Sequence, residues 1–170
     1  MNKAFTKEDA PDAPLIVPPR APLPDGVPNY VTARGLALLR SELAALESDR
    51  AALAASAGDD AERARRIARE SARIAALAAR LASAELVDPR RQPHDEVRFG
   101  ATATVRDDTG EARRYTIVGV DEADPAAGRV AFLAPVARAL QGARVGDVVT
   151  VRTGRGEESL EVLAIEYSEG

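Results

Sequence analysis

The chain has 170 residues, enough for one or two small domains, and its lack of cysteine excludes disulfide bonds and thiolate metal sites. Hydrophobic residues make up 45% of the chain but aromatic residues only 4%, so any core must be small and aliphatic. The net charge of −4 argues against general electrostatic binding to duplex nucleic acid, although a local basic stripe can still contact RNA or DNA.

The N-terminal segment, residues 1–28, is rich in proline, with seven prolines between Pro11 and Pro28. Because proline lacks a backbone N–H and disrupts helices and sheets, we expect an extended, mostly disordered arm. Leu15-Ile16-Val17 is either a short docking segment or an apolar patch in a linker. The segment has no apolar run typical of a signal peptide, and no span of about 18 apolar residues follows, so we expect a cytoplasmic protein that does not enter a membrane.

Two alanine- and leucine-rich runs, residues 33–57 and 60–85, predict an antiparallel helical hairpin, with Thr32 as the N-cap of the first helix. Apolar residues recur at coiled-coil spacing on both runs: Leu36, Leu39, Leu43, Leu46 and Leu53, then Ile67, Ile74, Leu77 and Leu81. A turn at Gly58 places Arg50 near Glu70. Arg50 then either forms a partly buried ion pair that fixes the register or extends to solvent.

The turn between the helices carries the acidic sequence Gly58-Asp59-Asp60-Ala61-Glu62. A long hairpin buries little surface, so its tip is suited to reach a partner. Asp59 and Glu62 also form the D-x-x-E pattern that begins many helices, which is an alternative to a functional role. Arg63 and Arg66 follow these two acids at the i,i+4 spacing of helical ion pairs.

Residues 29–88 form the predicted hairpin, residues 89–96 a linker, and residues 97–170 a small β-rich domain, so the fold class is α+β. A short helix is predicted from Pro135 to a stop at Gly142. His94 has no second histidine, cysteine or serine arranged around it, and we expect it to be structural or exposed. The predicted strands are Ala101–Arg106, Ala112–Val120, Arg129–Leu133, Val148–Arg152 and Leu160–Tyr167.

Three segments of residues 29–167 together resemble the bacterial transcript-cleavage factors GreA and GreB, with GreB the closer. They are Tyr30-Val31-Thr32-Ala33-Arg34-Gly35, Ala134-Pro135-Val136-Ala137-Arg138-Ala139-Leu140-Gln141-Gly142, and the final Leu163-Ala164-Ile165-Glu166-Tyr167. The resemblance implies an FKBP-like C-terminal domain that binds the rim of the secondary channel of bacterial RNA polymerase. It also implies that the hairpin enters this channel and that the polymerase then hydrolyses the 3′ end of backtracked RNA.

On this resemblance the protein is not an enzyme but a monomeric accessory factor that stimulates the nuclease activity of the polymerase. Asp59 and Glu62 match the two functional acids of the family tip, which help to hold a second Mg²⁺ at the polymerase active site, with Asp60 as a possible helper. No tightly bound cofactor is expected. The expected RNA contacts are Arg66, Arg69 and Arg73, for which a solvated helix face is the alternative, and the expected polymerase-docking residues are Leu133, Ala134, Pro135 and Arg138.

Several departures from the family pattern weaken the prediction of cleavage. Arg63, Arg65 and Arg66 replace an asparagine, an acid and an aromatic residue of the family tip. Each arm of the hairpin is about seven residues shorter than in typical GreB, which at 1.5 Å per residue shortens the shaft by about 10 Å. These departures favour an alternative, a regulator that occupies the channel without promoting cleavage. A third hypothesis is a peptide-binding or chaperone-like module that acts through its β-rich domain.

Overall fold

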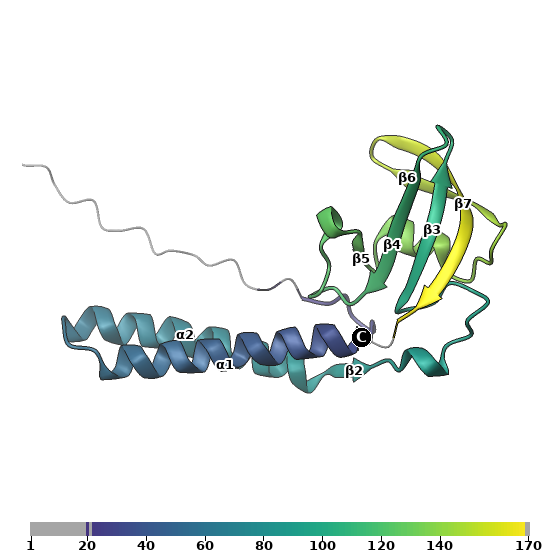
Figure 1. Ribbon diagram of the computed structural model, residues 1–170. Coiled ribbons are helices and arrows are strands. Elements are labelled where there is room, and N and C mark those ends of the chain that lie inside the picture. The colour runs from purple at the N-terminus through teal and green to yellow at the C-terminus, as the bar shows by residue number, and fades with distance from the viewer. Residues whose placement is uncertain (1–19, 21, 169–170) are drawn as a thin grey trace, which may run out of the picture.

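The computed structural model describes residue 20 and residues 22–168, which form a helical hairpin followed by a five-stranded sheet domain (Figure 1). This architecture confirms the predicted α+β class. The proline-rich residues 1–19, including Leu15-Ile16-Val17, lie outside the described residues. Residues 22–28 form no helix or strand, but Val27 N donates to Pro24 O at 3.1 Å across a turn in which Gly26 adopts a φ of 76°.

The hairpin consists of α1 (Ala33–Ala55) and α2 (Asp60–Ala82), each of 23 residues and therefore about 35 Å long. Thr32 caps α1 as expected, because its hydroxyl accepts a hydrogen bond from Gly35 N at 2.9 Å. In Figure 1 the two helices run side by side, and their connecting turn lies at the end far from the sheet. Most of the predicted apolar seam is confirmed by one cluster that contains buried Leu39, Leu46 and Leu77 and half-buried Leu36, Leu43, Ile74 and Leu81. Leu53 and Ile67, which lie nearer the tip, are half-buried but do not belong to this cluster.

Of the two alternatives for Arg50, the ion pair with Glu70 is not formed. Arg50 Nη1 instead lies 3.4 Å from Ser71 Oγ, and Glu70 pairs with Arg73 at 3.3 Å. Arg73 lies three residues after Glu70 on the same helix, so it reaches the carboxylate without crossing the helix interface. Arg50 is half-buried and does not extend fully into solvent either.

A short parallel pair of strands, which the sequence did not predict, closes the base of the hairpin. β1 (Asn29–Val31) precedes α1 and pairs with β2 (Ala84–Leu86), which follows α2. The buried Asn29 side chain donates to Arg80 O at 2.9 Å and to Ser83 Oγ at 3.1 Å. The start of α1 and the end of α2 are therefore tied together by backbone and side-chain hydrogen bonds.

After a 3₁₀ turn, η1 (Pro89–Arg91), the chain enters the sheet domain, whose strand order is β5-β4-β3-β7-β6. All neighbouring strands are antiparallel except β4 and β5, which are parallel. A second 3₁₀ turn, η2 (Pro125–Ala127), precedes β5. The strands are β3 (Ala101–Asp107), β4 (Ala112–Val118), β5 (Arg129–Ala131), β6 (Val148–Thr153) and β7 (Gly156–Tyr167).

Each predicted strand of this domain is present, although β5 is two residues shorter than expected and β7 begins four residues earlier. The predicted helix is α3 (Pro135–Leu140), which contributes Ala137 and Leu140 to the core, and Gly142 ends this segment with a φ of 79°. The fully buried core side chains are aliphatic, as the composition requires, and the largest are Leu140, Leu160, Val97, Val105, Val118 and Val162.

Candidate functional site

The tip of the hairpin presents Asp59 as the N-cap of α2. Its Oδ1 accepts hydrogen bonds from Ala61 N at 2.8 Å and from Glu62 N at 3.4 Å. Gly58 supplies the turn with a φ of 142°. The other oxygen of Asp59, Oδ2, makes no hydrogen bond with any residue that the structure describes. The capping interpretation of Asp59 is therefore correct, and it leaves one exposed carboxylate oxygen available.

The arginines near the tip pair differently from the expectation based on helical spacing. Arg63 binds Asp60 rather than Asp59, and it also donates to Ser56 O at 3.1 Å. The i,i+4 rule fails for Asp59 because an N-cap residue has extended rather than helical backbone angles. Glu62 forms no ion pair or hydrogen bond with a described residue through its side chain, so Arg66 does not compete for it.

The donor set at the tip fits a shared Mg²⁺ but not a complete metal site. Within residue 20 and residues 22–168, no group of three or more His, Cys, Asp or Glu side chains is placed to hold a metal ion. Asp59 and Glu62 offer hard carboxylate oxygens at an exposed turn, and Mg²⁺ commonly takes one or two protein carboxylates together with water or phosphate oxygens. Another molecule would have to supply the remaining ligands.

The three expected RNA-contact residues, Arg66, Arg69 and Arg73, are exposed on α2. Arg73 pairs with Glu70, whereas Arg66 and Arg69 have no ion pair with any described residue. Close to the tip, a groove between the helices is lined by Asp49, Ala52, Leu53, Ser56, Ala57, Arg66, Glu70 and Arg73. In the sequence, Arg80 continues the basic stripe of Arg66, Arg69 and Arg73 at helical spacing. It is not on this exposed surface, because only 10% of its side chain is exposed and its Nε lies 3.1 Å from Asp121 Oδ2.

The expected docking residues surround the start of α3. Leu133 and Ala134 are half-buried, Pro135 is exposed as the first residue of the helix, and Arg138 is exposed in its last turn. Arg138 makes no ion pair with the described acids, so none of them holds its side chain against the domain. Its guanidinium is available to a partner.

The hairpin meets the sheet domain at its base. Tyr30 on β1 packs between Phe99 and Phe132, with ring centroids 5.7 Å and 5.6 Å away, and the two phenylalanines lie 5.7 Å apart. Asp121 and Glu122, in the loop after β4, bind groups from both helices of the hairpin. This role could not be predicted from the sequence, since two acids that follow a strand are usual in a solvated turn.

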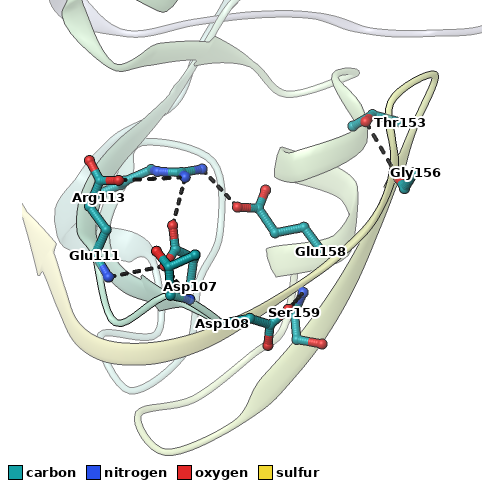
Figure 2. Close-up of polar contacts among 9 residues, drawn as sticks. Asp107, Asp108, Glu111, Arg113, Thr153, Gly156, Glu158 and Ser159 are labelled. Carbon is teal, nitrogen blue, oxygen red and sulfur yellow. Dashed lines mark hydrogen bonds and ion pairs between the residues drawn. The ribbon is translucent and has the colours of Figure 1, made fainter.

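A second polar cluster, at the β3–β4 and β6–β7 turns, is structural. Figure 2 shows Arg113 between Asp107 and Glu158, at 2.6 Å and 2.8 Å. Asp107 also accepts from the Thr109 hydroxyl at 2.6 Å and from Thr109 N and Glu111 N. These hydrogen bonds, that of Thr109 first, and the Arg113 charge hold the pKa of Asp107 below its usual value. Both oxygens of the Asp107 carboxylate have partners, and these contacts hold the β3–β4 turn together.

His94 is held by its surroundings, in agreement with the expectation of a structural or exposed residue. Its ring stacks on Tyr167 at 4.9 Å, and its Nε2 lies 3.1 Å from Pro89 O. Tyr167 in turn donates to Glu96 O at 2.7 Å, and burial raises the pKa of its hydroxyl. These contacts attach residues 89–98 to the end of β7.

Residues 92–167 match the family model described as "Transcription elongation factor, GreA/GreB, C-term". The chain is 46% identical over 89 residues to transcription elongation factor GreA from Rickettsia felis, covering 52% of this chain and 55% of that protein. It is 49% identical over 74 residues to GreA from Nitratidesulfovibrio vulgaris, covering 43% and 46%. The chain thus spans about half the length of the curated relatives that it matches. These relatives are GreA proteins, so the expected closeness to GreB has no support.

Two solved structures are also similar to this chain. The GreA factor homolog Gfh1 of Thermus thermophilus is 22% identical with a TM-score of 0.38, covering 82% of this chain and 99% of that one. A GreA/GreB elongation factor of Nitrosomonas europaea is 22% identical with a TM-score of 0.40, covering 83% and 99%. Within its described residues, this chain has no helix that is long and apolar enough to cross a membrane.

Proposed function

We propose that this chain, which belongs to the GreA/GreB family through its C-terminal domain, is a transcription elongation factor that stimulates RNA polymerase to cleave backtracked RNA. One observation carries this proposal: exposed carboxylates, Asp59 and Glu62, lie at the far end of a shaft about 35 Å long, with a GreA/GreB-type domain at the other end. Such a shaft suits delivery of ligands into a narrow channel.

In this proposal the sheet domain binds the rim of the secondary channel of the polymerase. The contact is made by Leu133, Ala134, Pro135 and Arg138. Arg138 supports this role because it is exposed and forms no ion pair with any acid that the structure describes. The hairpin then extends into the channel, and Arg66, Arg69 and Arg73 bind phosphates of the backtracked RNA.

Asp59 and Glu62 would hold a Mg²⁺ ion together with ligands of the polymerase. When bound, such an ion stabilises charge on the phosphate and activates water. The two hydrogen bonds from the backbone of α2 fix the Asp59 carboxylate, so it is oriented before any ion arrives. Asp60 is a weaker helper because Arg63 occupies it. The chain supplies only part of a ligand set, and for this reason we propose an accessory factor and assign the nuclease chemistry to the polymerase.

The test is cleavage of the RNA 3′ end in stalled, backtracked elongation complexes with Mg²⁺. Wild-type protein should stimulate cleavage, and Asp59→Asn/Glu62→Gln should not, although it should bind the polymerase with unchanged affinity. Glu47→Gln, which removes an exposed acid of α1 that has no described partner, is the matched control and should remain active. If the tip variant stimulates cleavage as strongly as wild-type protein, Asp59 and Glu62 do not hold the metal ion.

A second candidate is a channel-binding regulator that does not promote cleavage. This candidate is favoured by the estimate from the sequence that each arm is about seven residues, or about 10 Å, shorter than in typical GreB. In this chain α1 and α2 have 23 residues each. Because metal–ligand distances tolerate only about 0.2 Å, a tip this far from its target cannot contribute ligands. This candidate predicts that wild-type protein blocks cleavage by an active Gre factor and stimulates none.

A further inference from the structure

The loop between β4 and η2 lies directly against the base of the hairpin. A Cβ atom added at Gly119 would lie 2.5 Å from Tyr30 O and 3.7 Å from Val31 Cα. The backbone of this loop therefore approaches β1 as closely as a glycine permits. The next residues of the loop include Asp121 and Glu122, whose carboxylates reach the two helices.

Glu122 holds the beginning of α1, and the whole residue is only 7% exposed. Its carboxylate accepts hydrogen bonds from the Thr32 hydroxyl and from Arg34 Nη1, the latter at 3.0 Å. It lies so close to the first turn that a Cβ at Gly35 would be 2.7 Å from Oε2. A carboxylate at this position also interacts favourably with the positive end of the helix dipole.

Asp121 holds the end of α2. Its Oδ2 lies 3.1 Å from Arg80 Nε, and both side chains are only 10% exposed. Its Oδ1 accepts from Arg20 Nη1 at 2.5 Å, and the same guanidinium binds Glu42 on α1. Burial alone would lower the pKa of Arg20, but the hydrogen bonds to Asp121 and Glu42 raise it, so this cation stays charged. Two adjacent acids thus bind three arginines: Arg34 on α1, Arg80 on α2, and Arg20 in the segment before the hairpin.

These contacts differ in kind from the aromatic packing beside them. The cluster of Tyr30, Phe99 and Phe132 keeps the hairpin on the sheet, but apolar packing is non-directional and tolerates rotation. Glu122 forms hydrogen bonds to the start of α1, whereas Asp121 Oδ2 forms an ion pair with Arg80 near the end of α2 without a hydrogen bond. Hydrogen bonds depend on distance and direction and ion pairs depend on distance, so together these contacts fix the angle between the two parts.

The length of the shaft converts a small change of this angle into a large movement of the tip. A rotation of about 5° at the base of a helix about 35 Å long moves its far end by about 3 Å. Metal–ligand distances tolerate only about 0.2 Å. We therefore infer that Asp121 and Glu122 are positioning residues that aim the hairpin relative to the sheet domain, and so determine where Asp59 and Glu62 lie in the docked protein. The role of Asp121 and Glu122 in setting the angle of the hairpin is independent of the proposed function. The expected effect of these residues on cleavage rests on the proposed function.

The geometric part is tested by a distance measurement on the full chain. Because the chain contains no cysteine, Ala57→Cys at the tip and Val148→Cys at the sheet edge, where Val148 is 65% exposed, give a unique pair of spin-label sites. We expect Asp121→Asn/Glu122→Gln to broaden or shift the distance distribution. Glu158→Gln, which breaks an acid–arginine pair inside the sheet domain, is the matched control and should leave it unchanged.

Glu122→Gln alone provides a milder variant in case the double variant does not fold, since glutamine keeps an acceptor for Thr32 but loses the charge that binds Arg34. A folded variant with the narrow wild-type distribution would overturn the inference. In the cleavage assay, the positioning role predicts that the rate at saturating factor falls at least about tenfold while the half-saturating concentration stays the same. A loss of polymerase binding with an unchanged saturating rate would contradict it. If wild-type protein stimulates no cleavage, the proposed function fails, but the distance measurement still decides this inference.

Discussion

Replacement of Gly119 by alanine tests the junction at its closest backbone contact. The added Cβ would meet Tyr30 O at 2.5 Å, and an ordinary contact between such atoms begins near 3.4 Å, so the two segments must separate by about 0.9 Å. Tyr30 O cannot retreat easily because β1 is paired with β2. Overpacking of this kind typically costs about 1–3 kcal/mol.

The same separation predicts a movement of the tip. If the junction opens over a lever of one helix diameter, about 10 Å, a gap of about 0.9 Å corresponds to a rotation of about 5°. Over the length of α1 this rotation displaces residues near Gly58 by about 3 Å. Gly119→Ala should therefore lower the free energy of unfolding and also shift the distance between labels at residues 57 and 148.

The assays are urea denaturation and the label-distance measurement, with Gly154→Ala as the control. Gly154 has no atom within 4 Å of an added Cβ, so this substitution carries the general effect of alanine on the unfolded chain without the clash. If Gly119→Ala matches Gly154→Ala in stability and keeps the wild-type distance, the close contact between Gly119 and Tyr30 does not set the angle of the hairpin.

Three further predictions concern the hairpin core, the sheet domain and the docking surface. Leu77→Ala should lower the free energy of unfolding by about 2–5 kcal/mol in urea denaturation followed by circular dichroism, because Leu77 is only 2% exposed; a loss under about 1 kcal/mol would contradict its core role. The folded pKa of Asp107 is depressed, so its contribution to stability is complete above the unfolded value of 3.8 and is lost as the pH falls through the folded pKa. Asp107→Asn should therefore be less stable at neutral pH yet lose less further stability on acidification, and parallel pH profiles for the two proteins would count against this network. Arg138→Ala should weaken polymerase binding about tenfold with unchanged thermal stability, since Arg138 is exposed and forms no ion pair with a described residue; unchanged affinity in a binding titration would exclude it from the interface.

Features of the hairpin and sheet that depend on local sequence were predictable. The leucine spacing that contains Leu39 and Leu46 predicted α1, because apolar residues at helical spacing form one buried stripe whatever they pack against. Pro135 and Gly142 predicted the two ends of α3, because each restricts or permits particular backbone angles at its own position.

Features that depend on contacts between distant residues were not predictable from these patterns. β1 and β2 each have only three residues, and they pair across the whole hairpin. The roles of Asp121 and Glu122 arise only when the loop after β4 meets the hairpin base. Arg80 shows the same limit, because its spacing places it in the basic stripe while its position near the junction directs it to Asp121.

At the tip, the sequence identified the residues but not their pairing. The D-x-x-E pattern predicted that Asp59 would begin α2, and it does. The expected pair between Asp59 and Arg63 required helical geometry at a residue that precedes the helix, and Arg63 binds Asp60 instead. This difference matters for function, because it leaves both Asp59 and Glu62 without a competing cation among the described residues.

The role of the tip carboxylates is tested most directly by the rate of RNA 3′-end cleavage in backtracked elongation complexes, with and without the protein at saturating concentration. Wild-type protein should raise the rate in the presence of Mg²⁺, and Asp59→Asn/Glu62→Gln should bind equally well without raising it. Wild-type protein that binds the polymerase, leaves the rate unchanged and blocks an active Gre factor would contradict cleavage stimulation and identify a regulator that occupies the channel.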